Sequence, residues 1–181
     1  MHKLLIILFS ILLFQGCKSP EARQPVQQNS GTFIDASIER NKKLVEAEEA
    51  QIAAIMTSNP AQQYITSDNG FWYFYRTQDT IGGASPQFGD RVQFTYNMSD
   101  LDGNMIISEK ENGIQEYYID QTNQELITGI RQGLKLMKEG EKVTFLFPSH
   151  KAYGYYGIID KIGANIPVKS TVTLKLIDKT Q

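Results

Sequence analysis

The chain has 181 residues, of which 41% are hydrophobic and 21% charged, and its formal net charge at pH 7 is −2. This length suits one globular domain with an appendage, and the near-balanced charge argues against nucleic-acid binding. The single cysteine excludes an internal disulfide framework, a CxxC redox site and cysteine-ligated zinc. The GxxxxGK[ST], GxGxxG, GxSxG and HExxH motifs do not occur, so no nucleotide site, serine-hydrolase site, metal or cofactor is expected.

Residues 1–16 have the features of a secretory signal peptide. Lys3 supplies a positive charge, and Leu4–Phe14 is an almost unbroken apolar run that is too short to span a bilayer. Gly16 and Cys17 follow where the apolar run ends. This pattern resembles a bacterial lipoprotein signal, which implies cleavage before Cys17 and lipid on its sulfur and its new amino group. The alternative is an ordinary secretory signal that contains a cysteine.

A lipid anchor at Cys17 determines where the protein is expected to act. More than one acyl chain holds a protein stably on a membrane, so the body is expected in the cell envelope, as a periplasm-facing or outer-membrane lipoprotein. Removing residues 1–16 takes away one of the 18 basic residues and none of the 20 acidic ones, which leaves a net charge of −3. Residues 17–33 are polar and are predicted to form a flexible tether of roughly 20 to 25 Å.

Residues 34–60 are predicted to contain a helix. Its opposite face is rich in Glu and Lys, and its apolar residues recur at near-helical spacing: Ile34, Ile38, Val45, Ile52, Ile55 and Met56. A helix with so narrow an apolar face needs a partner surface. Packing on the domain that follows is favoured over pairing with a second copy of the chain.

The remainder of the chain alternates in the way that strands do. Residues 61–84 contain an aromatic strand, Phe71–Tyr75, and a linker. Further strands are predicted at residues 91–98, 105–108, 115–119, 142–147 and 171–177, and one short helix at residues 128–136. About five to six antiparallel strands and one helix packed across a curved sheet make an α+β domain at residues 85–181.

One ordered set of spacings between Glu125 and Gly154 resembles the FKBP family of peptidyl-prolyl cis/trans isomerases. It reads Leu-Ile-x-Gly-Ile, then Gly-Leu-x-x-Met-x-x-Gly-Glu-Lys, then Ala-Tyr-Gly. The resemblance covers residues 85–178 and implies the FKBP fold, in which a curved sheet wraps around the short helix. It also implies isomerase activity on proline-containing envelope proteins, with no cofactor, in an apolar pocket that a macrolide ligand can occupy.

The resemblance assigns roles to individual residues. Tyr96 matches a pocket tyrosine, and the backbone N–H of Ile127 and the hydroxyl of Tyr153 match donors to substrate carbonyls. The substrate-binding walls are assigned to Ile106, Ile107, Tyr117, Leu126, Ile130 and Leu174. Tyr118 is the alternative to Tyr117, because a one-residue change in register turns the other side chain toward the pocket.

Several features depart from the family pattern. Ile107 stands where the family usually has Asp, and Ile106, Ile130 and Leu174 replace aromatic residues. The loop at residues 155–165 is longer than in minimal members, which would let it enclose larger substrates or fill the pocket.

These departures leave more than one function open. The retained pocket residues favour an isomerase, whereas Ile107 favours a catalytically weak chaperone or binding module; a structural subunit of an envelope complex is a third reading. The lipoprotein signal and the sequence Ile-Glu-Arg-Asn-Lys-Lys-Leu also resemble the gliding-motility-associated isomerase lipoproteins of the GldI type.

Overall fold

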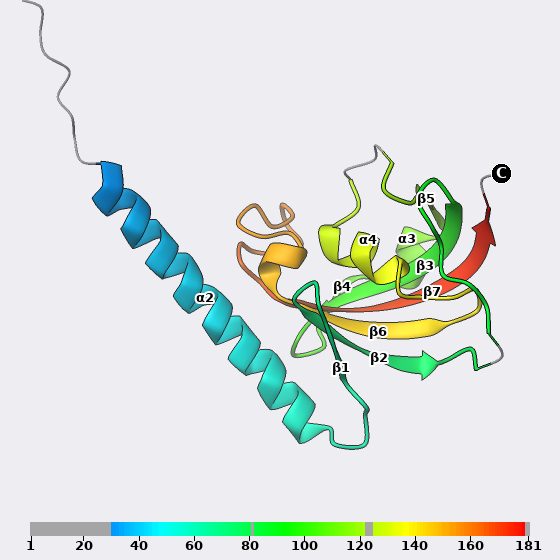
Figure 1. Cartoon of the computed structure of the whole chain (residues 1–181). Coiled ribbons are helices and arrows are strands. Elements are labelled where there is room, and N and C mark those ends of the chain that lie inside the picture. The colour runs from blue at the N-terminus through cyan, green and yellow to red at the C-terminus, as the bar shows by residue number, and fades with distance from the viewer. Residues whose placement is uncertain (1–29, 81, 122–124, 180–181) are drawn as a thin grey trace, which may run out of the picture. The chain divides into compact units, whose positions relative to one another are not determined.

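The computed structural model describes residues 30–80, 82–121 and 125–179 (Figure 1). The chain divides into two units, residues 1–38 and residues 39–181. The predicted signal peptide and the predicted lipidation site Cys17 lie outside the described residues. Helix α2 (Ser30–Ser58) begins in the first unit, inside the predicted tether, and continues into the second. Across the described ranges, no helix has both the length and the apolar character that a membrane crossing requires.

The second unit is built on an antiparallel sheet of seven strands. They are β1 (Ile65–Ser67), β2 (Phe71–Thr77), β3 (Arg91–Asp100), β4 (Met105–Ile107), β5 (Gln115–Tyr118), β6 (Lys142–Phe147) and β7 (Val168–Asp178). Their order is β1-β2-β6-β7-β3-β4, and β5 pairs with β3 beside this path. The predicted α+β class, with an antiparallel sheet and an N-terminal helix, is confirmed. The sheet exceeds the predicted five to six strands because the aromatic strand β2 pairs with β6 and brings β1 with it.

Helix α4 (Thr128–Leu134) lies on one face of this sheet, and two glycines bring it close (Figure 1). A Cβ added to Gly129 would lie 2.6 Å from the ring of Phe147, and one added to Gly133 would lie 2.8 Å from the ring of Phe145. Both rings belong to β6 and are fully buried. The helix backbone therefore rests directly on the β6 aromatic rings, which fixes the place where α4 begins.

The core between α4 and the sheet is aromatic and aliphatic. Phe71 packs edge-on against Phe145 and Phe147, with ring centroids 5.8 and 5.3 Å apart. Ile130 of α4 and Leu174 of β7 are fully buried in the same cluster. Edge-to-face pairs of this kind stabilise a core beyond the burial of their area.

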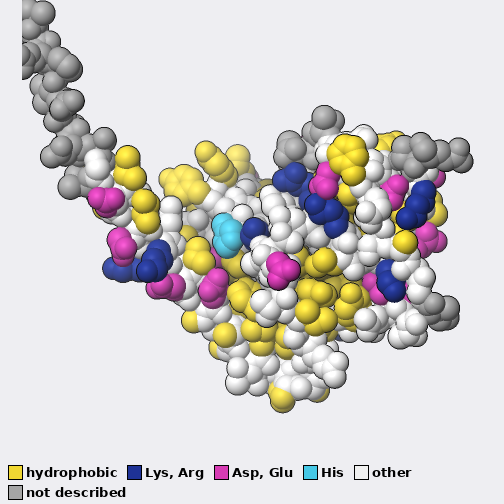
Figure 2. All heavy atoms as spheres, in the orientation of Figure 1, with side chains coloured by type: hydrophobic (Ala, Val, Ile, Leu, Met, Phe, Trp, Pro, Cys, Tyr) yellow, Lys and Arg dark blue, Asp and Glu magenta, His cyan; other side chains and the backbone are white. Residues whose placement is uncertain are grey.

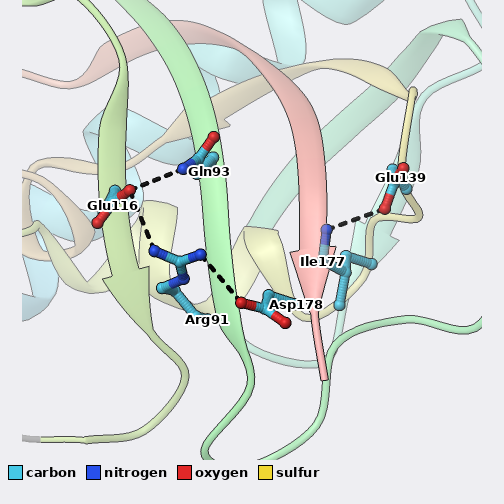
Figure 3. Close-up of polar contacts among 6 residues, drawn as sticks. All are labelled: Arg91, Gln93, Glu116, Glu139, Ile177 and Asp178. Carbon is cyan, nitrogen blue, oxygen red and sulfur yellow. Dashed lines mark hydrogen bonds and ion pairs between the residues drawn. The ribbon is translucent and has the colours of Figure 1, made fainter. Parts of the chain in front are cut away.

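Polar contacts fix the register of β5 against β3 (Figure 3). The guanidinium of Arg91 pairs with Glu116 at 3.5 Å and with Asp178 at 2.9 Å, and the side-chain amide of Gln93 donates to Glu116 at 2.7 Å. These residues come from β3, β5 and β7. A one-residue slip of β5 would break the contacts of Glu116 and would exchange the faces of its neighbours.

The second unit contains the docked part of α2. Ile52 is fully buried, Ile55 and Met56 are half-buried, and the carboxylate residue Glu48 is 2% exposed. The predicted packing of this helix on its own domain therefore applies to its C-terminal half. A polar side chain in the middle of that docked face was not predicted.

Two short helical segments complete the fold. Helix α3 (Glu109–Asn112) follows β4, and its N-cap Ser108 accepts a hydrogen bond from the Glu111 N–H. The 3-10 helix η1 (Ser149–Lys151) follows β6 and leads directly to Tyr153.

Candidate active site

The candidate site lies where β3, the beginning of α4 and the loop after η1 meet. Tyr96 and Ile127 are each 8% exposed, and Tyr153 is half-buried beside the same cluster. Burial, followed by the nearby phenol of Tyr96, raises the pKa of Tyr153 to about 12. The two tyrosines are therefore brought together, and the Tyr153 hydroxyl keeps its proton, and with it its ability to donate, throughout the neutral pH range.

Ile127 is the N-cap of α4, with φ −56° and ψ 145° and without a side-chain capping hydrogen bond. Amides at the start of a helix have no acceptor within the helix. The carbonyl of Ile127 already accepts the Arg131 N–H at 3.1 Å. A Cβ at Gly129 would lie 2.9 Å from the carbonyl oxygen of Lys151, so the first turn of α4 packs against the segment that carries Tyr153.

The predicted wall residues differ in burial. Ile130 and Leu174 are fully buried and belong to the core, so they form a floor beneath the site rather than an open wall. Ile106, Ile107 and Leu126 are half-buried and pack against that core. The aliphatic residue at position 107 thus contributes apolar surface where a carboxylate would contribute charge.

The two adjacent tyrosines of β5 differ in burial. Tyr117 is 3% exposed and pairs with the buried Val92, whereas Tyr118 is 49% exposed. The Tyr117 hydroxyl is buried and has no hydrogen-bond partner among the described residues. The Tyr117 residue lines a hollow of about 230 Å³ together with Phe94, Tyr96, Gln115, Glu116, Glu125 and Leu126. A buried unpaired hydroxyl is unfavourable, so the Tyr117 hydroxyl is an energetic cost within this part of the core.

The long loop after Tyr153 is closed on itself and directs apolar side chains outward. The Asn165 N–H donates to the Gly154 carbonyl at 2.7 Å. Tyr155, Tyr156 and Ile159 are 75%, 92% and 87% exposed. Figure 2 shows apolar side chains gathered at this end of the molecule. These three side chains are exposed to solvent, whereas Ile158 and Ile162 of the same loop pack in or against the core cluster beside Tyr153.

Sequence reasoning missed two contacts around the site. Lys161 in the long loop pairs with Glu111 of α3 at 2.5 Å, and so joins the loop to the segment that follows Ile107. Glu48 of α2 accepts two hydrogen bonds from Ser149. The second contact left a signal in the sequence, because Glu48 has the helical spacing of the apolar residues Val45 and Ile52.

The fold and this pocket define a class of protein, and the family follows from the sequence match. Residues 82–176 match the model of the FKBP-type peptidyl-prolyl cis-trans isomerase family, and the chain belongs to this family. Within the described residues there is no group of three or more His, Cys, Asp or Glu side chains placed to hold a metal ion.

Two curated relatives agree with this assignment. The chain is 30% identical over 139 residues to the probable FKBP-type peptidyl-prolyl cis-trans isomerase FkpA of Neisseria meningitidis, covering 76% of this chain and 49% of the relative. It is 32% identical over 90 residues to the human peptidyl-prolyl cis-trans isomerase FKBP9, covering 49% of this chain and 16% of that protein. The chain thus spans half or less of the length of these relatives.

Solved structures share the fold. A peptidyl-prolyl cis-trans isomerase from Pseudomonas syringae has a TM-score of 0.59 at 24% identity, covering 76% of this chain and 96% of that one. FkpA from Escherichia coli has a TM-score of 0.60 at 21% identity, covering 100% of this chain and 84% of that one. At these identities the likeness concerns the fold alone.

Proposed function

We propose that this protein is a peptidyl-prolyl cis/trans isomerase that acts at the pocket around Tyr96, Ile127 and Tyr153. The observation that carries the proposal is the meeting of Tyr96 with Tyr153 beside the uncapped start of α4. The Ile127 backbone and the Tyr153 side chain thus lie at one apolar cluster, which also contains Tyr96. Its substrates are proline-containing proteins of the cell envelope, and a macrolide ligand competes for the same pocket.

The mechanism follows from the chemistry of the amide bond. Rotation about an Xaa–Pro bond has a barrier of about 18–20 kcal/mol, because it breaks the resonance of the planar amide. The planar amide is more polar than the twisted one, so an apolar pocket disfavours the ground state relative to the twist. Tyr153 and the Ile127 N–H hold the flanking carbonyls and keep the bond oriented. No acid, base or nucleophile is needed.

The test is cis/trans exchange of Xaa-Pro peptides, measured by NMR with the full chain purified in detergent. Tyr153→Phe removes one hydroxyl and leaves the ring, so the fold should persist. A neutral hydrogen bond contributes about 0.5–1.5 kcal/mol, so kcat/KM should fall roughly 2- to 12-fold. An active wild type with an equally active variant would remove Tyr153 from the mechanism. An inactive wild type would refute the proposed isomerase activity.

A second function is favoured by Ile107 together with the exposed loop residues Tyr155, Tyr156 and Ile159. A pocket without a carboxylate, next to an apolar loop, suits a chaperone or binding module with weak isomerase activity. Such a protein would suppress aggregation of a denatured client as well after Tyr153→Phe as before it. Equal losses of chaperone and isomerase activity would instead assign both to one pocket.

The cellular setting is part of the proposal. A lipid at Cys17 holds the protein on a membrane of the envelope, and Cys17→Ser should move it to the soluble fraction. A role in a gliding-motility machinery of the GldI type is supported by the lipoprotein signal and by Ile107. Loss of the gene should then abolish cell spreading, and the wild-type gene should restore spreading more fully than Tyr153→Phe does. Normal spreading without the gene would remove this role.

A further inference from the structure

Glu48 is an unusual residue for the place that it occupies. It lies on the face of α2 that also contains the half-buried Leu44 and Val45 and the fully buried Ile52. Only 2% of the surface of Glu48 is exposed, so its carboxylate is shielded from water. Burial of a carboxylate is costly unless hydrogen bonds compensate for the lost water. Docking alone would be served better by an apolar side chain.

Both oxygens of this carboxylate bind the same residue. The backbone N–H of Ser149 donates to Oε2 of Glu48 at 2.7 Å, and the Ser149 hydroxyl donates to Oε1 at 2.6 Å. Ser149 is itself 2% exposed. Hydrogen bonds to a charged acceptor are short and roughly twice as strong as neutral ones. Glu48 therefore fixes both the backbone and the side chain of Ser149.

Ser149 in turn holds the residues on either side of Tyr153. Its carbonyl oxygen accepts the Ala152 N–H at 2.9 Å and the Gly154 N–H at 2.8 Å. Gly154 has a φ of +54°, a left-handed conformation that helps the chain to turn back toward that carbonyl. The position of Tyr153 is thus set by a chain of contacts that begins on α2.

We propose that Glu48 is a positioning residue for the isomerase site, which it serves by holding the turn that presents the Tyr153 hydroxyl. This inference rests on the proposed function, since it assigns to Glu48 an effect on catalysis. It makes the N-terminal helix a functional part of the isomerase. Without the carboxylate, the turn keeps its contact with α4 at Lys151 but loses these two hydrogen bonds to α2.

The main alternative is that Glu48 serves only to dock α2. Ile52→Ala separates the two roles, because it removes buried side-chain volume one helical turn away and leaves the carboxylate in place. Glu48→Leu removes both hydrogen bonds and keeps an apolar docking face. Glu48→Gln is the conservative variant: its amide oxygen can accept the Ser149 N–H, and its amide nitrogen can donate to the Ser149 hydroxyl oxygen.

The experiment measures kcat/KM for cis/trans exchange of an Xaa-Pro peptide, and unfolding by urea, on the full chain in detergent. Glu48→Leu should lower kcat/KM by up to the roughly 2- to 12-fold loss expected for Tyr153→Phe, because misplacing a substrate-binding group slows catalysis at most as much as removing it. Glu48→Gln should retain most of the wild-type kcat/KM. Ile52→Ala should reduce stability and leave kcat/KM near the wild-type value. If Glu48→Leu does not fold, Ser149→Ala tests the same link by removing the hydroxyl alone.

A double-mutant cycle with Tyr153→Phe provides a result that a purely structural role would not give. If Glu48 acts through Tyr153, then Glu48→Leu should have little further effect once the Tyr153 hydroxyl is gone. Independent, multiplying losses would overturn the inference, and so would a folded Glu48→Leu with wild-type kcat/KM. A wild type that fails to accelerate exchange would overturn the proposed function itself, which distinguishes the two failures.

Discussion

The close approach of α4 to the sheet gives a sharp test of the geometry behind the site. In Gly129→Ala, the new Cβ would lie 2.6 and 2.7 Å from two ring atoms of Phe147 and 2.9 Å from the carbonyl oxygen of Lys151. Ordinary van der Waals contact begins at 3.4 Å, so the helix or the ring must move by about 0.8 Å. Phe147 cannot move freely, because it is fully buried and stacked on Phe145 with ring centroids 5.4 Å apart.

The size of the effect follows from two opposing terms. Overpacking a core costs about 1–3 kcal/mol, and Ala is better than Gly in a helix by up to about 1 kcal/mol. We expect Gly129→Ala to reduce the free energy of unfolding by about 1–2 kcal/mol. Gly133→Ala should be milder, because its nearest neighbours are atoms of one ring. Gly31→Ala should be neutral or stabilising, because its Cβ would meet nothing within 4 Å.

The same displacement should reach the site, because Ile127 lies two residues before Gly129 at the start of the helix. Urea unfolding gives the stability of the three variants, and NMR exchange on an Xaa-Pro peptide gives their kcat/KM. We expect Gly129→Ala to lower kcat/KM by about tenfold and Gly31→Ala to leave it unchanged. A Gly129→Ala protein as stable and as active as the wild type would refute the argument that α4 rests rigidly on β6.

Two further predictions concern the ionisation of partly buried tyrosines and a charge at position 107. Burial raises the pKa of both Tyr153 and Tyr75 to about 12, against about 10 in an unfolded chain. Folding therefore favours the protonated phenols. Their contribution to stability is present below about pH 10 and is lost as the pH rises toward 12. Urea unfolding across this range should show the loss, and a slope unaltered by Tyr153→Phe would contradict the part assigned to that residue. Ile107→Asp should leave exchange activity unchanged or raise it; a folded variant with much lower kcat/KM would mean that the apolar wall has replaced the carboxylate.

The sheet was largely predictable because its strands alternate. The segment that contains β3 has Val92, Phe94, Tyr96 and Met98 on one face, and all four are buried. The place of β2 in the sheet was not predictable in the same way. Pairing between β2 and β6 joins residues about 70 positions apart, and hydrophobic alternation within a strand says nothing about which partner it pairs with.

The site was predictable only in part, because spacing identifies residues but not their surroundings. The ordered motif selected Ile127 and Tyr153, which the fold brings to adjacent segments. The choice between Tyr117 and Tyr118 needed the register of β5, which depends on the contacts of Glu116 with Arg91 and Gln93. The helical spacing of Glu48 with Val45 and Ile52 indicates its face, but its burial was not predicted, because a Glu among other charged residues of a helix is usually on the solvated face.

The missing carboxylate at position 107 changes which features must lower the isomerisation barrier. A thousandfold acceleration requires about 4 kcal/mol. Two hydrogen bonds, from Tyr153 and from the Ile127 N–H, contribute about 1 kcal/mol each, which leaves about half to the apolar pocket and to the orientation of the peptide. Orientation depends on how firmly the two donors are held. In this chain the glycines of α4 hold one and Glu48 holds the other, so residues outside the pocket should affect its rate more than Ile107 does.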